Sequence, residues 1–197
     1  MSAHRVRLPA GRVWLRVAKP DWAEPLDPAY AQEYGGRWNP PGSFATLYLN
    51  GDVRTALLQV ERMLQGSPAG IDDLADHAFT LVAATLPRDQ TAADAVSAGG
   101  LAALELPGTY PLDSDAAPVP HSQCQPIGQA VHDQEVRGVW CRSACTPDGS
   151  GRELAWFPAS SRSRANAIWP DPRPLSDWRE ARTWADLGLA DQADPHP

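Results

Sequence analysis

Residues 35–59, GGRWNPPGSFATLYLNGDVRTALLQ, hold the pattern from which the fold is most directly read. Two glycines before Arg37 and two prolines after Asn39 predict a tight turn with a fixed exit, because glycine permits sharp bends and proline restricts φ. The apolar run at 44–49 predicts a strand, which an Asn-Gly pair closes. A helix is expected over 52–65, where an aspartate serves as N-cap and apolar residues recur at the spacing of one helix face.

The rest of the chain alternates short apolar runs with turns rich in proline and glycine, which predicts a mixture of strands and helices. Further strands are expected at 12–18, 77–86, 138–142 and 153–157. Further helices are expected at 94–104, 127–134 and 175–187. The sequence shows no internal repeat, so it predicts a compact single domain of the α+β class.

Length and composition narrow the class of protein. A chain of 197 residues, 43% of them hydrophobic, is long enough for one domain with a real core and is not typical of a disordered protein. Its formal net charge of −7 argues against direct binding of nucleic acid, which needs a surplus of cations. No stretch reaches the roughly 18 apolar residues of a membrane span, so no membrane contact is expected.

The three cysteines, Cys124, Cys141 and Cys145, are an odd number in a chain too large to depend on disulfides. The last two have CxxxC spacing without a neighbouring histidine pair, so no metal site is expected. The first twelve residues also lack the apolar segment of a signal peptide. Together these observations predict a reduced, cytoplasmic protein.

Three places in the sequence hold side chains suited to chemistry. The turn at 35–42 is expected to present Arg37 and Asn39 in a defined pose, although an ordinary surface turn has the same composition. Tyr48 shares a strand face with polar neighbours, and it either contacts a ligand or packs in the core. Ser143 follows a predicted strand, a common place for functional side chains and a more common one for structural serines.

Arginine dominates the cations, since Lys19 is the single lysine among 17 basic residues. Arginine is suited to bidentate contact with phosphate and carboxylate groups. A bias toward GC-rich codons gives the same composition, so the sequence leaves both explanations open.

The run at 35–59 resembles the first signature of the RES domain family, which is named for its Arg, Glu and Ser. That signature is a GGRWN-type turn, a YL-type strand and a helix that opens with a TAL-type sequence. The second signature also appears in order, as CQPIG at 124–128, GVWCRSA at 138–144 and LAWF at 154–157. The resemblance covers residues 12–165.

On this resemblance the chain divides into three parts. Residues 1–11 are expected to be an N-terminal extension, and residues 12–165 the RES domain. Residues 166–197 are expected to form a Pro/acid-rich C-terminal segment that packs on the domain or trails from it.

The resemblance implies a fold and an activity. RES domains resemble the ADP-ribosyltransferase fold, and they are the toxins of bacterial toxin–antitoxin pairs whose antitoxin is a Xre-type helix-turn-helix protein. They cleave NAD and release nicotinamide, typically by phosphorolysis to ADP-ribose 1''-phosphate, and some act as protein ADP-ribosyltransferases. The expected partners are therefore NAD, inorganic phosphate and a Xre-type antitoxin. NAD is expected as a substrate, with no separate cofactor.

The resemblance also implies roles for individual residues. Arg37 corresponds to the family arginine and is expected to bind the phosphates of the dinucleotide. Tyr48 is expected to lie against the nicotinamide ring. Ser143 corresponds to the family serine, beside the ribose or the incoming phosphate. Asn39 is expected mainly to order the turn.

The sequence departs from the family at its glutamate, because the corresponding helix position holds Gln59. Loss of nicotinamide leaves positive charge on the ribose, which a carboxylate stabilises and a neutral amide does not. Glu61 is two residues further along the helix, about 200° around its axis, and is expected to point away from the site. The alternative is therefore a weakened RES protein that binds NAD or another nucleotide without turnover, or a protein ADP-ribosyltransferase.

Overall fold

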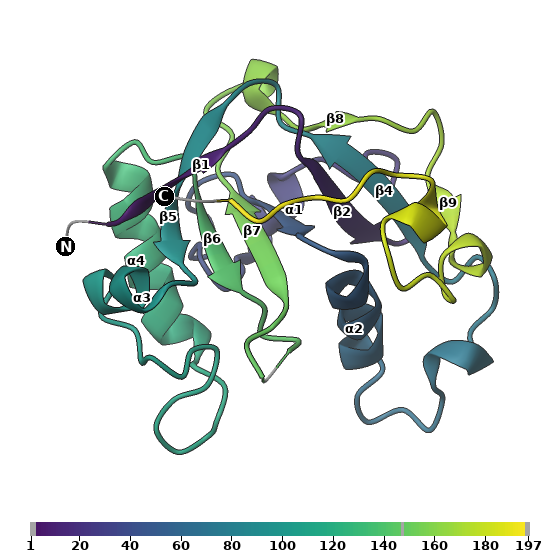
Figure 1. Cartoon of the computed structure of the whole chain (residues 1–197), viewed down its shortest axis with the longest axis horizontal. Helices are drawn as coiled ribbons and strands as arrows, with labels where there is room; N and C mark the ends of the chain where they lie inside the picture. The colour runs from purple at the N-terminus through teal and green to yellow at the C-terminus, as the bar shows by residue number, and fades with distance from the viewer. Residues whose placement is uncertain (1–2, 147, 196–197) are drawn as a thin grey trace.

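One mixed β-sheet organises the chain (Figure 1). The computed structural model describes residues 3–146 and 148–195. The strands are β1 (Arg5–Leu8), β2 (Val13–Ala18), β3 (Leu47–Asn50), β4 (Thr80–Thr85), β5 (Gln90–Ala95), β6 (Gly138–Arg142), β7 (Arg152–Trp156), β8 (Asn166–Ala167) and β9 (Arg173–Pro174). Their order is β1-β5-β6-β7-β3-β2-β4-β8, and β9 also pairs with β4. The pair β5–β6 is parallel, whereas the other pairs are antiparallel.

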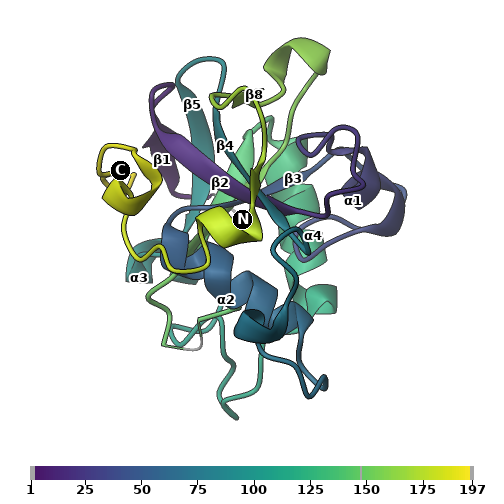
Figure 2. The same ribbon diagram turned by 90° about the vertical axis from the view of Figure 1, so that its right-hand side faces the viewer.

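Short helices cover part of the sheet (Figures 1 and 2). They are α1 (Ala29–Tyr34), α2 (Val53–Met63), α3 (Ala98–Ala103) and α4 (His121–Asp133). Single-turn 3₁₀ helices occur at Ile71–Asp73, Ser161–Ser163, Leu175–Asp177 and Ala185–Leu187. Helix α2 packs against β2 and β3, α3 against β5, and α4 against β6. This arrangement confirms the α+β class.

Side-chain alternation gives the two faces of the sheet different coverings. One face carries a cluster that we call the tryptophan core. Its large members are Leu8, Trp14, Leu47, Leu49, Trp140, Leu154 and Trp156. Trp14 and Trp140 meet edge to face with ring centroids 5.4 Å apart. Because successive strand residues point to opposite faces, the residues between these face the helices.

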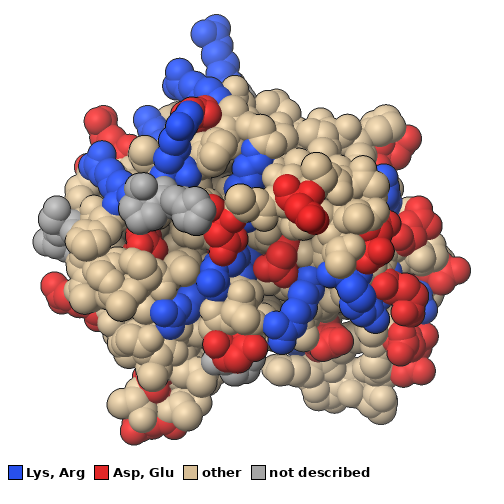
Figure 3. Space-filling model, in the orientation of Figure 1, with Lys and Arg blue, Asp and Glu red and all other residues tan. Residues whose placement is uncertain are grey.

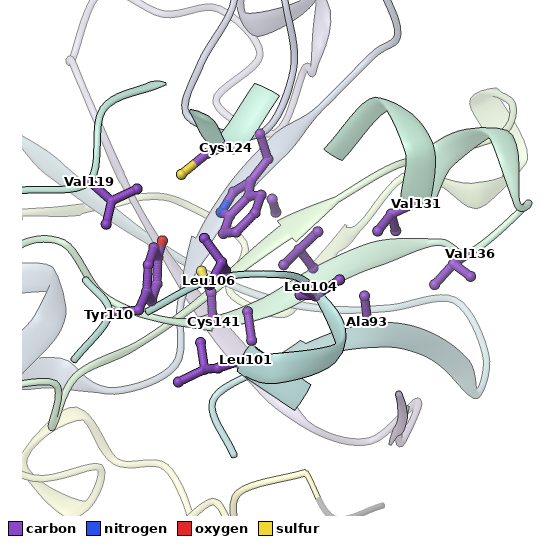
Figure 4. Packing of buried hydrophobic residues seen from close by; sticks show 14 of the residues in the cluster. Ala93, Leu101, Leu104, Leu106, Tyr110, Val119, Cys124, Val131, Val136 and Cys141 are labelled. Carbon is purple, nitrogen blue, oxygen red and sulfur yellow. The ribbon is translucent and has the colours of Figure 1, made fainter. Parts of the chain in front are cut away.

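Two separate cores cover the helical face. The α4 core joins β5, β6 and β7 to α3 and α4, and includes Trp38, Tyr110, Cys124, Val131 and Cys141 (Figure 4). The α2 core joins β2 and β4 to α2 and the C-terminal segment, and includes Leu15, Val60, Leu81, Trp178 and Leu187. The two cores lie on opposite sides of β3, and Tyr48 of β3 packs against the edge of the α4 core.

The helix expected over 52–65 is confirmed as α2. Asp52 is its N-cap, since its carboxylate accepts a hydrogen bond from the backbone N–H of Thr55 at 2.6 Å. The helix expected over 127–134 begins earlier than predicted, at His121. Pro126 lies inside it, but a proline removes a single N–H donor, and the buried positions Cys124 and Gly128 keep the first turns packed on the sheet.

The short helix expected near 94–104 is present as α3, which starts at Ala98, whereas the strand β5 that continues to Ala95 was not predicted. Asp94 makes the change of direction. Its carboxylate accepts hydrogen bonds from the backbone N–H groups of Val96 and Ser97 and from the Ser97 hydroxyl. Such local bonds compete with a regular ladder or helix and favour a turn.

Segments near both ends of the described residues belong to the fold. The β1 strand pairs with β5 at the edge of the sheet. The single helix expected at 175–187 is wrong, because two separate 3₁₀ turns occupy this stretch. Buried Trp178 and Leu187 nevertheless fix it to the α2 core. Near the end of the chain, the Asp194 carboxylate pairs with Arg12 and Arg152 at 3.5 and 3.3 Å.

Positive and negative side chains are interspersed on the face drawn in Figure 3. The basic residues described on that face therefore form no continuous strip of the kind that follows a nucleic-acid backbone. Within the described parts of the chain, no helix combines the length and the apolar character required to cross a membrane.

A glycine-to-alanine pair tests the packing of α4. A Cβ on Gly128 would lie 1.8 Å from the Trp38 carbonyl oxygen, whereas a Cβ on Gly108 would meet nothing within 4 Å. We expect Gly128→Ala to lower the free energy of unfolding by about 1–3 kcal/mol through overpacking, although alanine favours helix. Gly108→Ala should change it little. Urea unfolding measures both, and equal stability of the two variants would contradict this packing.

Candidate functional site

A cavity of about 490 Å³ opens over β3, between the two cores of the helical face. Its lining comes from several elements far apart in the sequence. The polar members that concern the chemistry are Arg16, Arg37, Asn50, Gln59, Arg62 and Glu153. The volume is within the range of small-molecule sites, roughly 300–1,000 Å³.

The floor of the cavity follows from strand alternation. Tyr48 and Asn50 lie on β3 between residues of the tryptophan core, so both face the helices. Glu153 is directly opposite Asn50 in the β3–β7 register and therefore shares that face. Three polar side chains thus occupy sheet positions that apolar residues fill elsewhere.

The turn that carries Arg37 is tied to this floor by the Tyr48 hydroxyl. That hydroxyl accepts a hydrogen bond from the Trp38 N–H at 2.9 Å and donates one to Asn39 Oδ1 at 2.8 Å. The Asn39 amide in turn donates to the Ala31 carbonyl. A Cβ on Gly36 would lie 2.4 Å from the Tyr48 hydroxyl, so the close approach requires glycine.

Asn39 itself is fully buried and is not among the residues that line the cavity. Its position fits the expected role of ordering the turn. Tyr48 lines the cavity while its hydroxyl serves the turn. Burial raises the pKa of Tyr48, so this phenol stays protonated.

The Arg37 guanidinium is anchored at one end and open at the other. Its Nη1 donates to the Val119 carbonyl at 2.7 Å. Among the described residues, none forms a hydrogen bond with its Nε or Nη2. Both atoms are accessible to solvent, since neither is among the buried polar atoms without a partner. These two donors are therefore available on the cavity side for an anionic ligand.

Two further arginines line the cavity. Arg16 donates from Nη1 to the Tyr48 carbonyl at 2.7 Å, and burial lowers its pKa to about 10, so it remains cationic at neutral pH. Arg62 on α2 donates to the Ala144 carbonyl and so fixes the turn after β6 to the helix. His121 also lines the cavity, and burial together with the charges of Arg37 and Arg62 lowers its pKa.

Gln59 lies in the cavity at the position that the helix pattern indicates. Its Oε1 accepts a hydrogen bond from the Asn50 amide at 2.8 Å. Glu61 is exposed and is not among the residues that line the cavity; it lines a neighbouring hollow that shares Arg62, Ala144 and Cys145 with the cavity. Among the lining residues that the structure describes, Glu153 is the single carboxylate.

Ser143 is fully buried and does not line the cavity. Its hydroxyl donates a hydrogen bond of 2.5 Å to Glu153 Oε1 and accepts one from the Cys145 N–H at 3.0 Å. Burial raises the pKa of Glu153, while the Ser143 hydrogen bond and the charges of Arg37 and Arg62 oppose the rise.

Glu153 was not among the residues predicted to form the site, although it lies at the start of a predicted strand. Alternation along that strand puts Glu153 on the face opposite Leu154 and Trp156, and this pattern could have identified Glu153 as a site residue from the sequence. The described residues contain no group of three or more His, Cys, Asp or Glu side chains placed to share a metal ion.

Comparison with known proteins identifies the family of the chain. Residues 12–188 match the RES domain model, and the chain therefore belongs to the RES domain family. It is 28% identical over 117 residues to the NAD(+) phosphorylase MbcT of Mycobacterium tuberculosis (strain H37Rv), and equally to that of Mycobacterium bovis. The matched segment covers 55% of this chain and 55% of each relative, so the chain spans about half the length of these curated relatives.

The fold is also similar to a chain in the crystal structure of the M. tuberculosis MbcT–MbcA toxin–antitoxin complex. The TM-score is 0.65 at 19% sequence identity, and the match covers 90% of this chain and 92% of that chain. The similarity supports a shared fold over almost the whole chain.

Removal of one hydroxyl tests the link between turn and sheet. Tyr48→Phe leaves the Trp38 N–H and Asn39 Oδ1 without their partner, and we expect it to lower the free energy of unfolding by about 1–3 kcal/mol. Tyr34→Phe is the matched control, because Tyr34 is 60% exposed and such surface changes stay within about 0.5 kcal/mol. Chemical denaturation compares them, and similar midpoints would contradict the bracing role.

Proposed function

We propose that this chain is a RES-type toxin that cleaves the bond between nicotinamide and ribose in NAD, with inorganic phosphate as the acceptor. The C1''–N bond breaks and a C1''–O bond to phosphate forms. NAD⁺ and HPO₄²⁻ give nicotinamide, ADP-ribose 1''-phosphate and one proton. NAD is a substrate in this reaction and not a resident cofactor.

The observation that carries the proposal is the charge of the cavity in a chain of the RES family. Three guanidinium groups, of Arg16, Arg37 and Arg62, line it, and planar guanidinium groups bind phosphate oxygens in pairs. The ligand class that this favours is an anion of several phosphates, as in a dinucleotide. The similarity to the mycobacterial NAD(+) phosphorylases supports the same substrate.

Individual roles follow from the positions of the side chains. Arg37 binds the phosphates through its free Nε and Nη2, and the ring of Tyr48 provides a surface for the nicotinamide. Asn39 holds the turn, and Gln59 contributes an amide hydrogen bond in place of the family carboxylate. Ser143 does not line the cavity, and it acts by orienting Glu153 through its hydrogen bond.

A second protein is expected to control this activity. The similar structure is a toxin–antitoxin complex, and we propose a Xre-type antitoxin as the partner of this chain. The free cysteines fit a reducing compartment, so we place both proteins in the cytoplasm, where NAD and phosphate are available.

The activity is tested by incubating the purified chain with NAD and phosphate and following nicotinamide by chromatography and the phosphorylated product by ³¹P NMR. We expect nicotinamide release that depends on phosphate and a product with a new sugar phosphate. Saturable NAD binding without release would support the alternative of a binding protein. Transfer of label from NAD to protein in a lysate would support an ADP-ribosyltransferase.

Arg37 is tested by substitution with alanine. Loss of a charge-assisted contact costs about 1.5–3 kcal/mol, so we expect Arg37→Ala to weaken NAD binding roughly 10- to 100-fold. The buried Val119 carbonyl loses its partner, so the folded state should be destabilised by about 1–3 kcal/mol without unfolding. Arg88→Ala, at an exposed residue outside the cavity, is the matched control and should bind NAD normally. Calorimetric titration measures both, and an unfolded Arg37→Ala variant would instead make this arginine structural.

A further inference from the structure

We propose that Glu153 on β7 is the carboxylate that stabilises the positive charge on the ribose during NAD cleavage. This proposal rests on the function proposed above and names the residue that replaces the missing helix glutamate. The family signature expects an acid at the Gln59 position, and the structure supplies one from a strand instead.

The first step of the argument is placement. Glu153 is opposite Asn50 in the register of β3 and β7, and directly opposed residues have Cβ atoms about 5 Å apart. The Asn50 amide also bonds Gln59 at 2.8 Å. Glu153 therefore reaches the cavity on the sheet side of the same polar cluster that Gln59 enters from α2.

The second step is charge. Loss of neutral nicotinamide from NAD⁺ leaves an oxocarbenium-like ribose, and the electron pair of the broken C1''–N bond departs with the nicotinamide. The arginines that line the cavity repel this positive charge. Glu153 is the one lining carboxylate among the described residues, so it is the group placed to oppose that repulsion.

The third step is positioning. The Ser143 hydroxyl donates to Glu153 Oε1, and the Cys145 N–H donates to that hydroxyl, which fixes its direction. No described residue makes a hydrogen bond to Glu153 Oε2. Ser143 is thus a positioning residue, whereas Oε2 of Glu153 is the atom available to the ribose.

The protonation state of Glu153 depends on its charged and titratable neighbours. Those that interact with it are Arg37, Tyr48, Asp52, Arg62, Tyr110, Cys141 and Cys145. His121 lines the same cavity. Burial raises the pKa of Glu153, so the charged form is lost as pH falls through a value above the ordinary one of about 4.3.

The direct test compares wild type, Glu153→Gln and Glu153→Gln combined with Gln59→Glu. We expect Glu153→Gln to lower kcat for nicotinamide release by about 10²–10³, the usual cost of one lost electrostatic contact at a reacting centre. NAD affinity should remain or increase, because a negative charge near the phosphates is removed. The double variant should recover part of the rate, since its carboxylate enters the same cluster from α2.

A pH profile tests the proposal without depending on the folding of Glu153→Gln. Wild-type kcat should fall on the acid side with an apparent pKa above that of an ordinary glutamate. Ser143→Ala removes a bond that favours the charged carboxylate, so it should move this acid limb to higher pH. His121→Gln should leave the acid limb where it is, and its disappearance in that variant would assign the titration to the histidine and overturn the proposal.

The remaining outcomes separate this proposal from the proposed function. A wild type that cleaves NAD, with Glu153→Gln folded and equally fast, overturns the role of Glu153 alone. If the wild type is inactive and Gln59→Glu is active, Glu153 does not supply the negative charge. The cavity can then still support NAD cleavage when the helix carries a carboxylate. No NAD cleavage by either protein overturns both.

Discussion

The site depends on the way the sheet uses its two faces. Along β3 and β7 the large apolar side chains, such as Leu49 and Trp156, all point into the tryptophan core. On the opposite face, polar side chains lie between the α2 core and the α4 core, and hydrogen bonds offset the cost of burying them. Tyr48, Asn50 and Glu153 occupy these positions.

The turn that precedes β3 is then fixed to this floor through a side chain. The Tyr48 hydroxyl satisfies one backbone donor and one side-chain acceptor of the turn, so Arg37 is held relative to the sheet by hydrogen bonds. Gly36 permits the approach, and Gly128 permits the close contact of α4 with Trp38. Arg37 is thereby mounted on two packed layers, which limits the movement of its backbone.

Local patterns in the sequence were sufficient for the elements that carry the site. The extent of α2 and its aspartate cap follow from helix periodicity and capping chemistry, and the prediction was confirmed. The start of α4 could not be found in this way, because its first turns depend on packing around Cys124 and Gly128. The strand β5 was not predicted, and the short helix expected near 94–104 begins only at Ala98, because local hydrogen bonds to the Asp94 carboxylate form a turn between the two elements.

The sequence by itself determined the family signature, the arginine in its glycine turn and the glutamine at the position of the family glutamate. Each of these lies within a short stretch of sequence, and residues that are close in sequence are also close in the folded structure. The tertiary structure alone decided that Glu153, 94 residues beyond Gln59, faces the same cavity. Strand register is set by packing between distant segments, so no local pattern could bring these two residues together.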